Sequence, residues 1–299
     1  MKINLRLEDG SFTSDAGLAG SIALEHFEGL LAGATSSSFE RDVADRDGFL
    51  NSLPLLVNAT ENVCLSSIPQ EEEVRESLFS MPVDSTPGPD WFLVSFYRDA
   101  WELVGLHIME AVLDFFGGGY LNKGIYSSRV VLIPKIKNPT LINQFRPMCL
   151  CNVSYKILAT VIRRRISRIL PKVISEEQHG FIKGWSIQGE IGIVKELVHD
   201  INKRVVGSKV IFQVDMNKAY DNIEWRFIIR VMRHMGFQER FCDICFRCYS
   251  STWLSISLLG ISFGFFKFVR GVRQGDPLPP FLFVLAQDAL SRNLNLLLG

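Results

Sequence analysis

The chain has 299 residues, of which 47% are apolar and 21% charged, so we expect a packed core and exclude wholesale disorder. Six cysteines in a chain of this length do not make a disulfide framework, and the opening MKINLRLEDGSF has no apolar signal core. The longest apolar run, WLSISLLGISFGFF, is too short and too rich in glycine and serine to span a bilayer. We therefore expect an intracellular protein, in the nucleus or cytoplasm, that is not secreted and has no membrane partner.

The net charge of zero hides a difference between the two parts of the chain. Residues 1–120 carry 6 lysines and arginines against 20 aspartates and glutamates, whereas residues 121–299 carry 26 against 12. Such a division indicates that the basic part meets a polyanion. The alternative is that the two parts pair with each other, since charge patterns are weak guides to partners.

Helices predominate in the acidic part. Residues 13–33 have the pattern of an amphipathic helix, with Ser14 or Asp15 as its cap and Gly33 as its stop. The Ser-rich, acidic and turn-forming content of residues 34–60 predicts a loop.

The next two predicted helices are separated by a turn. Residues 68–82 are predicted to form a helix that starts at Pro69. Its first turn contains glutamates, whose negative charge is favourable near a helix N-terminus. Residues 83–90 contain two prolines and a glycine, which predict a turn. Residues 91–116 have helical periodicity, and the glycine triplet at 117–119 ends the helix. That triplet lacks the spacing and the following Lys-Ser/Thr of a phosphate loop.

The basic part mixes strands with helices. β-Branched and apolar runs predict strands at 127–135 and 209–215, and a hairpin made of 253–259 and 265–269. Helical spacing predicts helices at 154–174, 222–237, 239–250 and 280–298.

One aspartate ends the predicted strand 209–215, and a second lies six residues later. Asp215 ends that strand, where a carboxylate suits a hard divalent cation such as Mg²⁺ that also binds substrate phosphates. Asp221 begins the sequence DNIE, which has Glu224 three residues on and fits a capping box. We therefore interpret Asp221 as structural and Asp215 as the functional candidate.

Cations in two further segments are candidates for phosphate binding. Lys135 ends the strand in LIPKIKNP, and Arg146 precedes a proline in a turn-rich context. A point-charge lysine and a forked arginine together suit a triphosphate, although each alone is more often a solvated charge.

The segment RGVRQGDPLPPF combines charge with a permissive backbone. Gly275 permits a close approach to a ligand, and the Gln274 amide can contact a base or sugar edge. Arg270 and Arg273 are candidates for phosphate contacts.

Three arginines are predicted to project from the helix at 154–174. Its apolar residues recur at helical spacing, which turns Arg164, Arg165 and Arg168 outward. Binding to nucleic-acid phosphates is one interpretation, and a solvated helix face is the other.

The cysteines at 242, 245 and 248 have a C-x₂-C-x₂-C spacing that resembles an iron–sulfur run without its fourth cysteine and proline. The alternative, which we favour, is three buried core thiols.

Five segments in order resemble the blocks of a reverse transcriptase from a non-LTR (LINE-type) retrotransposon, most similar to plant copies. They are TPGPDWF, LIPKIKNP, FRPMCLCNVSYKI, VDMNKAYDNIEW and RGVRQGDPLPP. The resemblance implies an α/β (α+β) right-hand polymerase, with fingers and an incomplete palm in residues 121–299. Residues 1–120 would form an acidic, mostly helical N-terminal extension. The implied reaction is RNA-directed DNA synthesis, with an RNA template, a DNA primer, deoxynucleoside triphosphates and Mg²⁺.

The resemblance also implies roles for individual residues. Asp215 is similar to the first metal-binding aspartate, and Met216 would bind the same metal through its carbonyl. Lys135 and Arg146 resemble the finger residues that hold the triphosphate. Tyr220 resembles the aromatic gate beneath the sugar, which excludes the ribonucleotide 2′-hydroxyl. Gln274 and Gly275 match the loop that contacts nucleotide and template.

The chain also departs from the family pattern. The family pattern has glycine where Trp91 stands, asparagine where Tyr126 stands and arginine where Trp185 stands. It has aspartate and asparagine where Gly189 and Glu190 stand, and serine where Pro279 stands. The catalytic Ala-Asp-Asp block is absent from the 299 residues. We therefore expect a truncated reverse transcriptase that is inactive alone, because two-metal phosphoryl transfer needs further carboxylates. The alternatives are a non-catalytic RNA- or DNA-binding remnant and a product without function.

Overall fold

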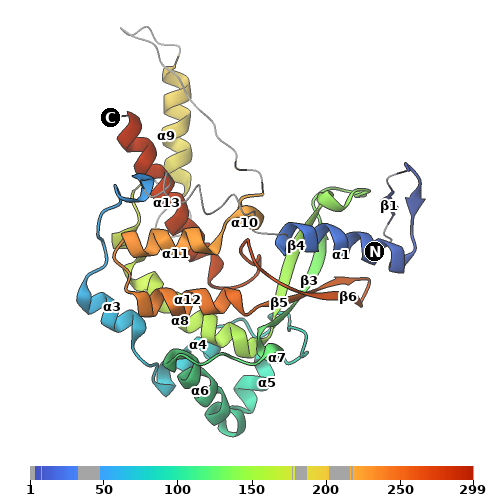
Figure 1. Cartoon of the computed structure of the whole chain (residues 1–299), viewed down its shortest axis with the longest axis horizontal. Helices are drawn as coiled ribbons and strands as arrows, with labels where there is room; N and C mark the ends of the chain where they lie inside the picture. Colours follow the sequence, from blue (N-terminus) through green and yellow to red (C-terminus); the bar gives the residue numbers. More distant parts are fainter. Residues whose placement is uncertain are drawn as a thin grey trace.

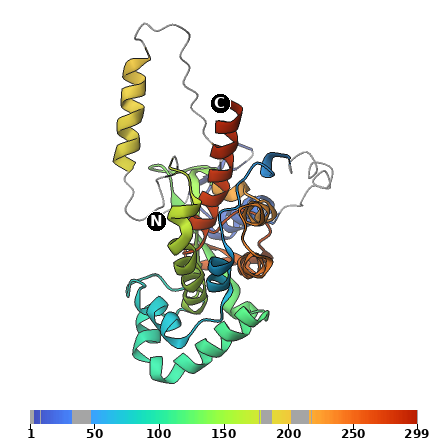
Figure 2. The same cartoon turned by 90° about the vertical axis from the view of Figure 1, so that its left-hand side faces the viewer.

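A computed structural model describes residues 4–7, 9–32, 48–176, 178, 187–201, 216 and 218–298. This part of the chain consists of helices built around a four-stranded sheet (Figure 1), which agrees with the predicted α+β class. In the view of Figure 2, α4, α5 and α6 lie at one end of the molecule and α9 at the other. Among the described helices, none has the length and apolar character needed to cross a membrane.

The sheet is made of two hairpins that are far apart in the sequence. β3 (Ser127–Pro134) pairs with β4 (Phe145–Cys151), and β5 (Trp253–Leu258) pairs with β6 (Ile261–Lys267). The strand order is β4-β3-β5-β6; β3 and β5 run parallel, and the outer pairs are antiparallel. The predicted strand at 127–135 and the predicted C-terminal hairpin are therefore confirmed.

One face of this sheet is buried and the other is open. Ser128, Val130 and Leu132 of β3 are buried, whereas Arg129 and Ile133, which alternate with them, are partly and fully exposed. This alternation follows from the two-residue period of a strand. Because cross-strand partners share a face, the open face continues onto β4 and β5.

The sequence does not predict β4. It favours a turn-rich context around Arg146 because Pro147 follows, yet the structure has a strand there. Pro147 is tolerated because β4 lies at the edge of the sheet, where a missing N–H costs no ladder hydrogen bond.

The helix α8 (Val153–Val173) lies at the centre of the core. Ile157, Leu158, Val161, Ile162 and Ile166 are buried, as their helical spacing predicts. Among the helices that contact α8 are α3 (Ala59–Ser66), α4 (Glu71–Phe79) and α13 (Pro279–Leu298).

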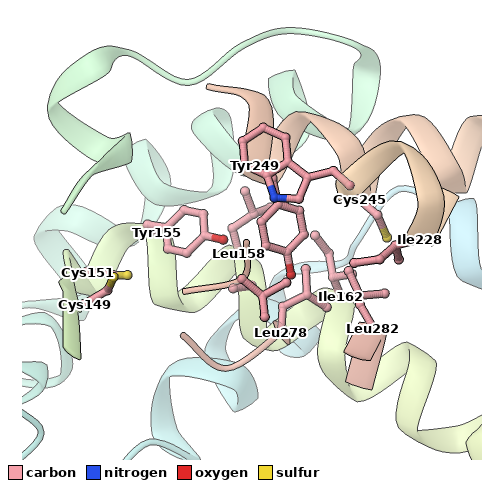
Figure 3. Close-up of a cluster of buried hydrophobic side chains, with 14 of the residues drawn as sticks. Cys149, Cys151, Tyr155, Leu158, Ile162, Ile228, Cys245, Tyr249, Leu278 and Leu282 are labelled. Atoms are coloured by element: carbon pink, nitrogen blue, oxygen red, sulfur yellow. The ribbon is translucent and has the colours of Figure 1, made fainter. Parts of the chain in front are cut away.

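Two further predicted helices, α11 (Trp225–His234) and α12 (Glu239–Ser250), pack against each other, and α11 also contacts α13. Their buried side chains meet those of α8 in one cluster (Figure 3), which includes Tyr155, Cys245 and Tyr249.

The N-terminal helix α1 (Ala16–Leu31) follows a small hairpin of β1 (Leu5–Arg6) and β2 (Phe12–Thr13). Its predicted cap is confirmed, since the Asp15 carboxylate accepts a hydrogen bond from the Leu18 N–H at 2.7 Å. A Cβ atom at Gly20 would lie 2.3 Å from the Phe263 ring, so glycine there lets α1 approach β6 closely. Gly33, the predicted stop, lies outside the described residues.

Residues 91–116 form two helices where the sequence predicts one. α5 (Val94–Asp99) and α6 (Trp101–Gly117) are separated at Ala100, whose ψ of 15° is not helical. The apolar periodicity continues across Ala100, so the pattern carries no sign of the break. The glycine triplet does end α6, with Gly118 in the left-handed region.

Several short or unpredicted elements complete the described part: α7 (Lys123–Tyr126), η2 (Ile142–Gln144), α9 (Ile187–Asp200) and α10 (Ala219–Asn222). The helix α3 is also unpredicted, although Asn58 and Glu61 form the capping box that begins it. Helices of residues 1–120 contact elements of residues 121–299 directly, and the division into an extension and a polymerase core stays a prediction.

Candidate nucleotide and nucleic-acid site

The β3–β4 hairpin brings Lys135 and Arg146 onto one face. Arg146 pairs with Ile133 in the antiparallel register, and the Lys135 N–H donates to the Gln144 carbonyl at 2.8 Å. Lys135 and Gln144 lie one residue beyond β3 and β4. Continued strand alternation places them on the same face as Ile133 and Arg146. Both cations are exposed, and Lys135 Nζ donates to the Asn143 carbonyl at 2.9 Å. The two predicted triphosphate-binding residues are therefore neighbours on the open face.

The loop that contains Gln274 and Gly275 runs along the free edge of β4. The Cys149 N–H donates to the Gln274 carbonyl at 2.7 Å. Gly275 has a φ of +99°, and a Cβ atom there would lie 2.8 Å from the Cys149 carbonyl oxygen. The sequence predicts that Gly275 permits close approach, and the close approach seen here is to the β4 backbone.

Tyr220 is connected to the same loop through the backbone. Its carbonyl accepts a hydrogen bond from the Val272 N–H at 2.7 Å. Its ring stacks on Phe283, with centroids 4.4 Å apart and planes 18° apart. Partial burial raises the pKa of its hydroxyl, so the side chain is neutral.

Asp221 is not the cap that the sequence predicts. The helix α11 begins after Glu224, which makes no side-chain cap hydrogen bond, and Asp221 lies inside the short α10. Its carboxyl is buried, and burial raises its pKa while the positive charges of Lys218 and Lys135 act in the opposite direction. The capping-box prediction fails because Ile223 and Glu224 are extended, so α11 does not begin directly after Asp221. Lys218, which sequence reasoning missed, precedes α10 in a left-handed conformation.

The metal-binding prediction falls mostly on residues that the structure does not describe. Asp215 and the predicted strand 209–215 lie outside the described residues, as does Trp185. Met216 is described, and its side chain is 43% exposed. Within the described ranges, no group of three or more His, Cys, Asp or Glu side chains could hold a metal ion.

The predicted outward orientation of Arg165 is wrong. Its side chain is 5% exposed, and Nε and Nη2 donate to the Glu73 carboxylate at 2.8 and 2.7 Å. Its Nη1 donates to the carbonyls of Leu65 and Ser67. The reason is that α4 covers this side of α8, which the spacing of α8 alone does not reveal.

Two more cations of α8 also meet the acidic helices. Arg164 pairs with Glu76 at 2.5 Å, and Lys172 pairs with Glu61 at 2.9 Å. The acidic and basic parts of the chain therefore pair with each other here, which is the alternative left open for the charge division. Arg168 is exposed, and a phosphate contact at this residue stays a prediction.

The arginines before Gln274 also have internal partners. Arg270 Nε donates to the Leu30 carbonyl at 2.6 Å, at the C-terminal end of α1, so its predicted phosphate contact competes with a capping role. Arg273 has a fully buried side chain that pairs with Asp276 at 2.6 Å. The prediction that Arg273 meets a phosphate is therefore wrong, because burial removes it from any ligand at the surface.

Cys242, Cys245 and Cys248 are buried, free thiols in the core, as the favoured interpretation expects. Burial raises the pKa of Cys242 to about 12 and raises the pKa values of the other two as well. Thiols that stay protonated are poor metal ligands.

Three of the departures from the family pattern can be located. Trp91 has a φ of +64°, a left-handed conformation that favours the family's glycine, and its ring lies 4.4 Å from the Arg129 guanidinium. Tyr126 is buried beside Tyr155, and Pro279 begins α13. Gly189 and Glu190 lie in α9, and their side chains are outside the description.

Residues 133–297 match the family model described as reverse transcriptase (RNA-dependent DNA polymerase). The chain is 27% identical over 215 residues to the transposon TX1 uncharacterized 149 kDa protein of Xenopus laevis, covering 72% of the chain and 16% of that protein. It is 30% identical over 224 residues to the Pol polyprotein from the type-2 retrotransposable element R2DM of Drosophila melanogaster, covering 75% and 20%.

A third relative is the Pol polyprotein from the type-1 retrotransposable element R2 of Nasonia vitripennis, which is 24% identical over 207 residues, covering 69% and 20%. The chain thus spans at most about a fifth of the length of these relatives. The family model matches more than half of the chain and includes Lys135, Arg146, Tyr220 and the Gln274–Gly275 loop. The resemblance seen in the sequence blocks is therefore confirmed, and the chain belongs to the reverse transcriptase (RNA-dependent DNA polymerase) family.

Proposed function

We propose that this chain supplies the nucleotide-binding side of an RNA-directed DNA polymerase that copies an RNA template from a DNA primer. The observation that supports this most directly is the open face of the β3–β4 hairpin. Lys135 and Arg146 are exposed together on that face, and Gln274 and Gly275 lie along its edge. A cationic face beside a permissive loop suits a deoxynucleoside triphosphate.

Each residue has a distinct role in this proposal. Lys135 provides a point charge on a flexible stem, and Arg146 provides a planar fork that can bind two phosphate oxygens at once. The stacked Tyr220 ring lies beneath the sugar and leaves no room for a 2′-hydroxyl. Gln274 contacts the base or sugar edge, and Gly275 keeps the loop close to β4.

Magnesium is the metal that we propose for this site. Asp215 and the Met216 carbonyl would hold it, because Mg²⁺ prefers oxygen ligands and completes its shell with substrate phosphates. Bound there, the ion would neutralise charge on the triphosphate. The described residues contain no three-ligand cluster, and the 299 residues contain no Ala-Asp-Asp tripeptide. We therefore limit the proposal to nucleotide binding and assign no bond-forming step.

Nucleotide affinity of single variants tests the proposal. Anisotropy of a deoxynucleoside triphosphate labelled on its base would report binding by the 299-residue chain. Loss of a charged hydrogen-bond donor costs about 1.5 to 3 kcal/mol, roughly 10- to 100-fold in affinity. We expect that loss for Lys135→Ala and for Arg146→Ala, and no change for Lys137→Ala, an exposed control near the same loop. Equal affinity of all four proteins would reject the site.

A second candidate function, binding of RNA or DNA without catalysis, is favoured by another feature of the open face. Lys123 lies 4.7 Å from the centroid of the Trp253 ring, and Trp253 stacks on Phe265 with centroids 5.0 Å apart. Arg129 lies diagonally next to Trp253 on the same face, because Ser127 pairs with Trp253 and Arg129 with Ser255. Aromatic rings interleaved with cations suit stacked bases and phosphates of a single strand.

Salt-dependent binding separates this second function from the first. Titration of the chain with single-stranded RNA at several salt concentrations would give the slope of log affinity against log salt. Each lost phosphate contact should reduce that slope by roughly 0.7. We expect Arg129→Gln to reduce the slope and Trp253→Ala to lower affinity at unchanged slope. Phe12→Ala, which removes an exposed ring of β2, is the control. If Arg129→Gln and Trp253→Ala leave both the affinity for RNA and its salt slope unchanged, the open face does not bind RNA.

A further inference from the structure

A buried ion pair encloses the two loop residues that we assign to the nucleotide. Arg273 immediately precedes Gln274, and Asp276 immediately follows Gly275. Both charged side chains are fully buried, and Arg273 Nη2 lies 2.6 Å from Asp276 Oδ2. Gln274 is only partly buried between them and Gly275 is exposed. The charges therefore point inward, and the residues between them stay accessible.

Tyr155 of α8 joins this ion pair to the core. Its hydroxyl donates to Asp276 Oδ2 at 2.9 Å, and the Arg273 guanidinium lies 4.2 Å from the centroid of its ring. Burial raises the pKa of Tyr155 well above its ordinary value, so the hydroxyl remains a donor. Tyr155 belongs to the buried cluster that also holds Tyr249 and Leu278 (Figure 3).

Further hydrogen bonds fix the same pair to other elements. Arg273 donates to the Ser128 hydroxyl of β3 at 3.3 Å and to the Cys248 carbonyl of α12 at 3.4 Å. Asp276 Oδ1 accepts from the Leu278 N–H at 3.0 Å. The ends of this four-residue loop are thereby tied to three separate parts of the fold.

The loop itself needs this support. Gly275 is in the left-handed region at φ +99°, and the Gln274 carbonyl accepts from the Cys149 N–H at 2.7 Å. Burying two charges is costly, and well-packed apolar side chains often stabilise a fold as much as a buried ion pair does. What a hydrogen-bonded ion pair provides in addition is one fixed geometry, which is what a residue aimed at a ligand requires.

We propose that Arg273, Asp276 and Tyr155 form a clamp that positions Gln274 and Gly275 for the incoming deoxynucleoside triphosphate, a role that rests on the proposed function. The three are positioning residues, since none of them reaches the open face. The clamp acts through the loop backbone, so its effect on the nucleotide passes through Gln274.

A double-mutant cycle tests whether the effect of the clamp on nucleotide binding passes through Gln274. Asp276→Asn keeps the shape of the side chain and removes its charge, and Tyr155→Phe removes only the donor. Each should weaken binding of a labelled deoxynucleoside triphosphate by about tenfold in the otherwise unchanged chain. Combined with Gln274→Ala, neither should weaken binding further, because the side chain that the clamp positions is already gone.

Tyr249→Phe is the matched control. Tyr249 belongs to the same cluster, is equally buried, and its hydroxyl has no hydrogen-bond partner among the described residues. It should keep wild-type nucleotide affinity. Thermal melts of all variants would show how far each is destabilised, and Tyr155→Phe serves as the milder variant where Asp276→Asn fails to fold.

The outcomes separate the clamp from the proposed function. If Gln274→Ala weakens binding while folded Tyr155→Phe and Asp276→Asn bind normally, the clamp is only structural and the inference is overturned. If clamp variants weaken binding equally with and without Gln274, their effect does not pass through that residue, and the inference also fails. If Gln274→Ala, Lys135→Ala and Arg146→Ala all leave affinity unchanged, the proposed function itself is rejected and the clamp role with it.

Discussion

Tyr220, which we propose as the sugar-selecting residue, is held at two points. Its ring is stacked on Phe283 and its carbonyl is bound by the Val272 N–H, so both ends of the residue are held. A ring fixed in this way cannot move aside for an additional hydroxyl on the sugar. The discrimination between sugars should therefore depend on the ring and not on the phenolic oxygen.

Substitution of Tyr220 tests this at the residue scale. Steric discrimination of this kind is worth about 1 to 3 kcal/mol, roughly tenfold or more in relative affinity. Tyr220→Ala should bring the affinity for a ribonucleoside triphosphate up toward that for the deoxy form. Tyr220→Phe, which keeps the ring, should retain the wild-type preference. Competition of both nucleotides against one labelled deoxynucleotide measures the ratio, and an unchanged ratio in Tyr220→Ala would refute the gate.

The sequence motifs predicted which residues belong to the candidate site. They did not predict which of those side chains are buried. The sequence separates Lys135, Arg146, Gln274 and Gly275 from the many surface residues of the same types, and the structure brings these four together at one hairpin. No pattern in the sequence indicates that Arg273 is buried. Its partner Asp276 stands three residues on, and Tyr155, more than a hundred residues away, completes the cluster.

At the scale of elements, the contact between α4 and α8 determines what α8 can bind. Helical spacing predicts α8 and its apolar face correctly, because both depend only on local sequence. The covering of its arginines depends on Glu73 and Glu76 of α4, about ninety positions away in the chain. No periodicity in α8 encodes such a partner, so a solvated or nucleic-acid-binding face was the natural expectation.

The two ion pairs of this interface should differ strongly in stability. Removing one partner of a buried pair leaves an uncompensated charge and costs about 3 to 5 kcal/mol, whereas an exposed pair is worth about 1 kcal/mol or less. Glu73 is 22% exposed beside the buried Arg165, so Glu73→Ala should cost about 3 kcal/mol. Glu76→Ala, which breaks the exposed pair with Arg164, is the control. Denaturant titration measures both, and equal costs would contradict the role of burial.

Several apolar side chains of α9 and of the end of α13 are exposed. The α9 side chains with exposed fractions from 49% to 60% are Ile191, Ile193, Val194, Leu197 and Val198. The first half of α13 is buried because it packs on α8 and α11. Its second half exposes Leu294 and Leu296. In Figure 2, α9 stands apart from the other helices.

This surface should bind a hydrophobic dye in the folded state. Exposed apolar patches of this kind mark contact sites or aggregation liabilities. The native chain should therefore raise the fluorescence of 8-anilinonaphthalene-1-sulfonate, and Ile193→Glu with Leu197→Glu should lower that signal without changing the melting temperature. Lys195→Glu is the control on the same helix. If the native chain does not raise the fluorescence of the dye, these side chains are covered in solution.

In the proposed function, a deoxynucleoside triphosphate lies on the open face of β3 and β4 beside the Gln274 loop. A deoxynucleotide with a photoreactive group on its γ-phosphate tests this most directly, because the cross-link marks where the phosphates lie. After irradiation and proteolysis, mass spectrometry should locate the label on residues 129–146, and excess unlabelled deoxynucleotide should prevent it. Lys135→Ala and Arg146→Ala should each reduce the yield. A competable label on the α11–α12 surface, with residues 129–146 unlabelled, would contradict the account.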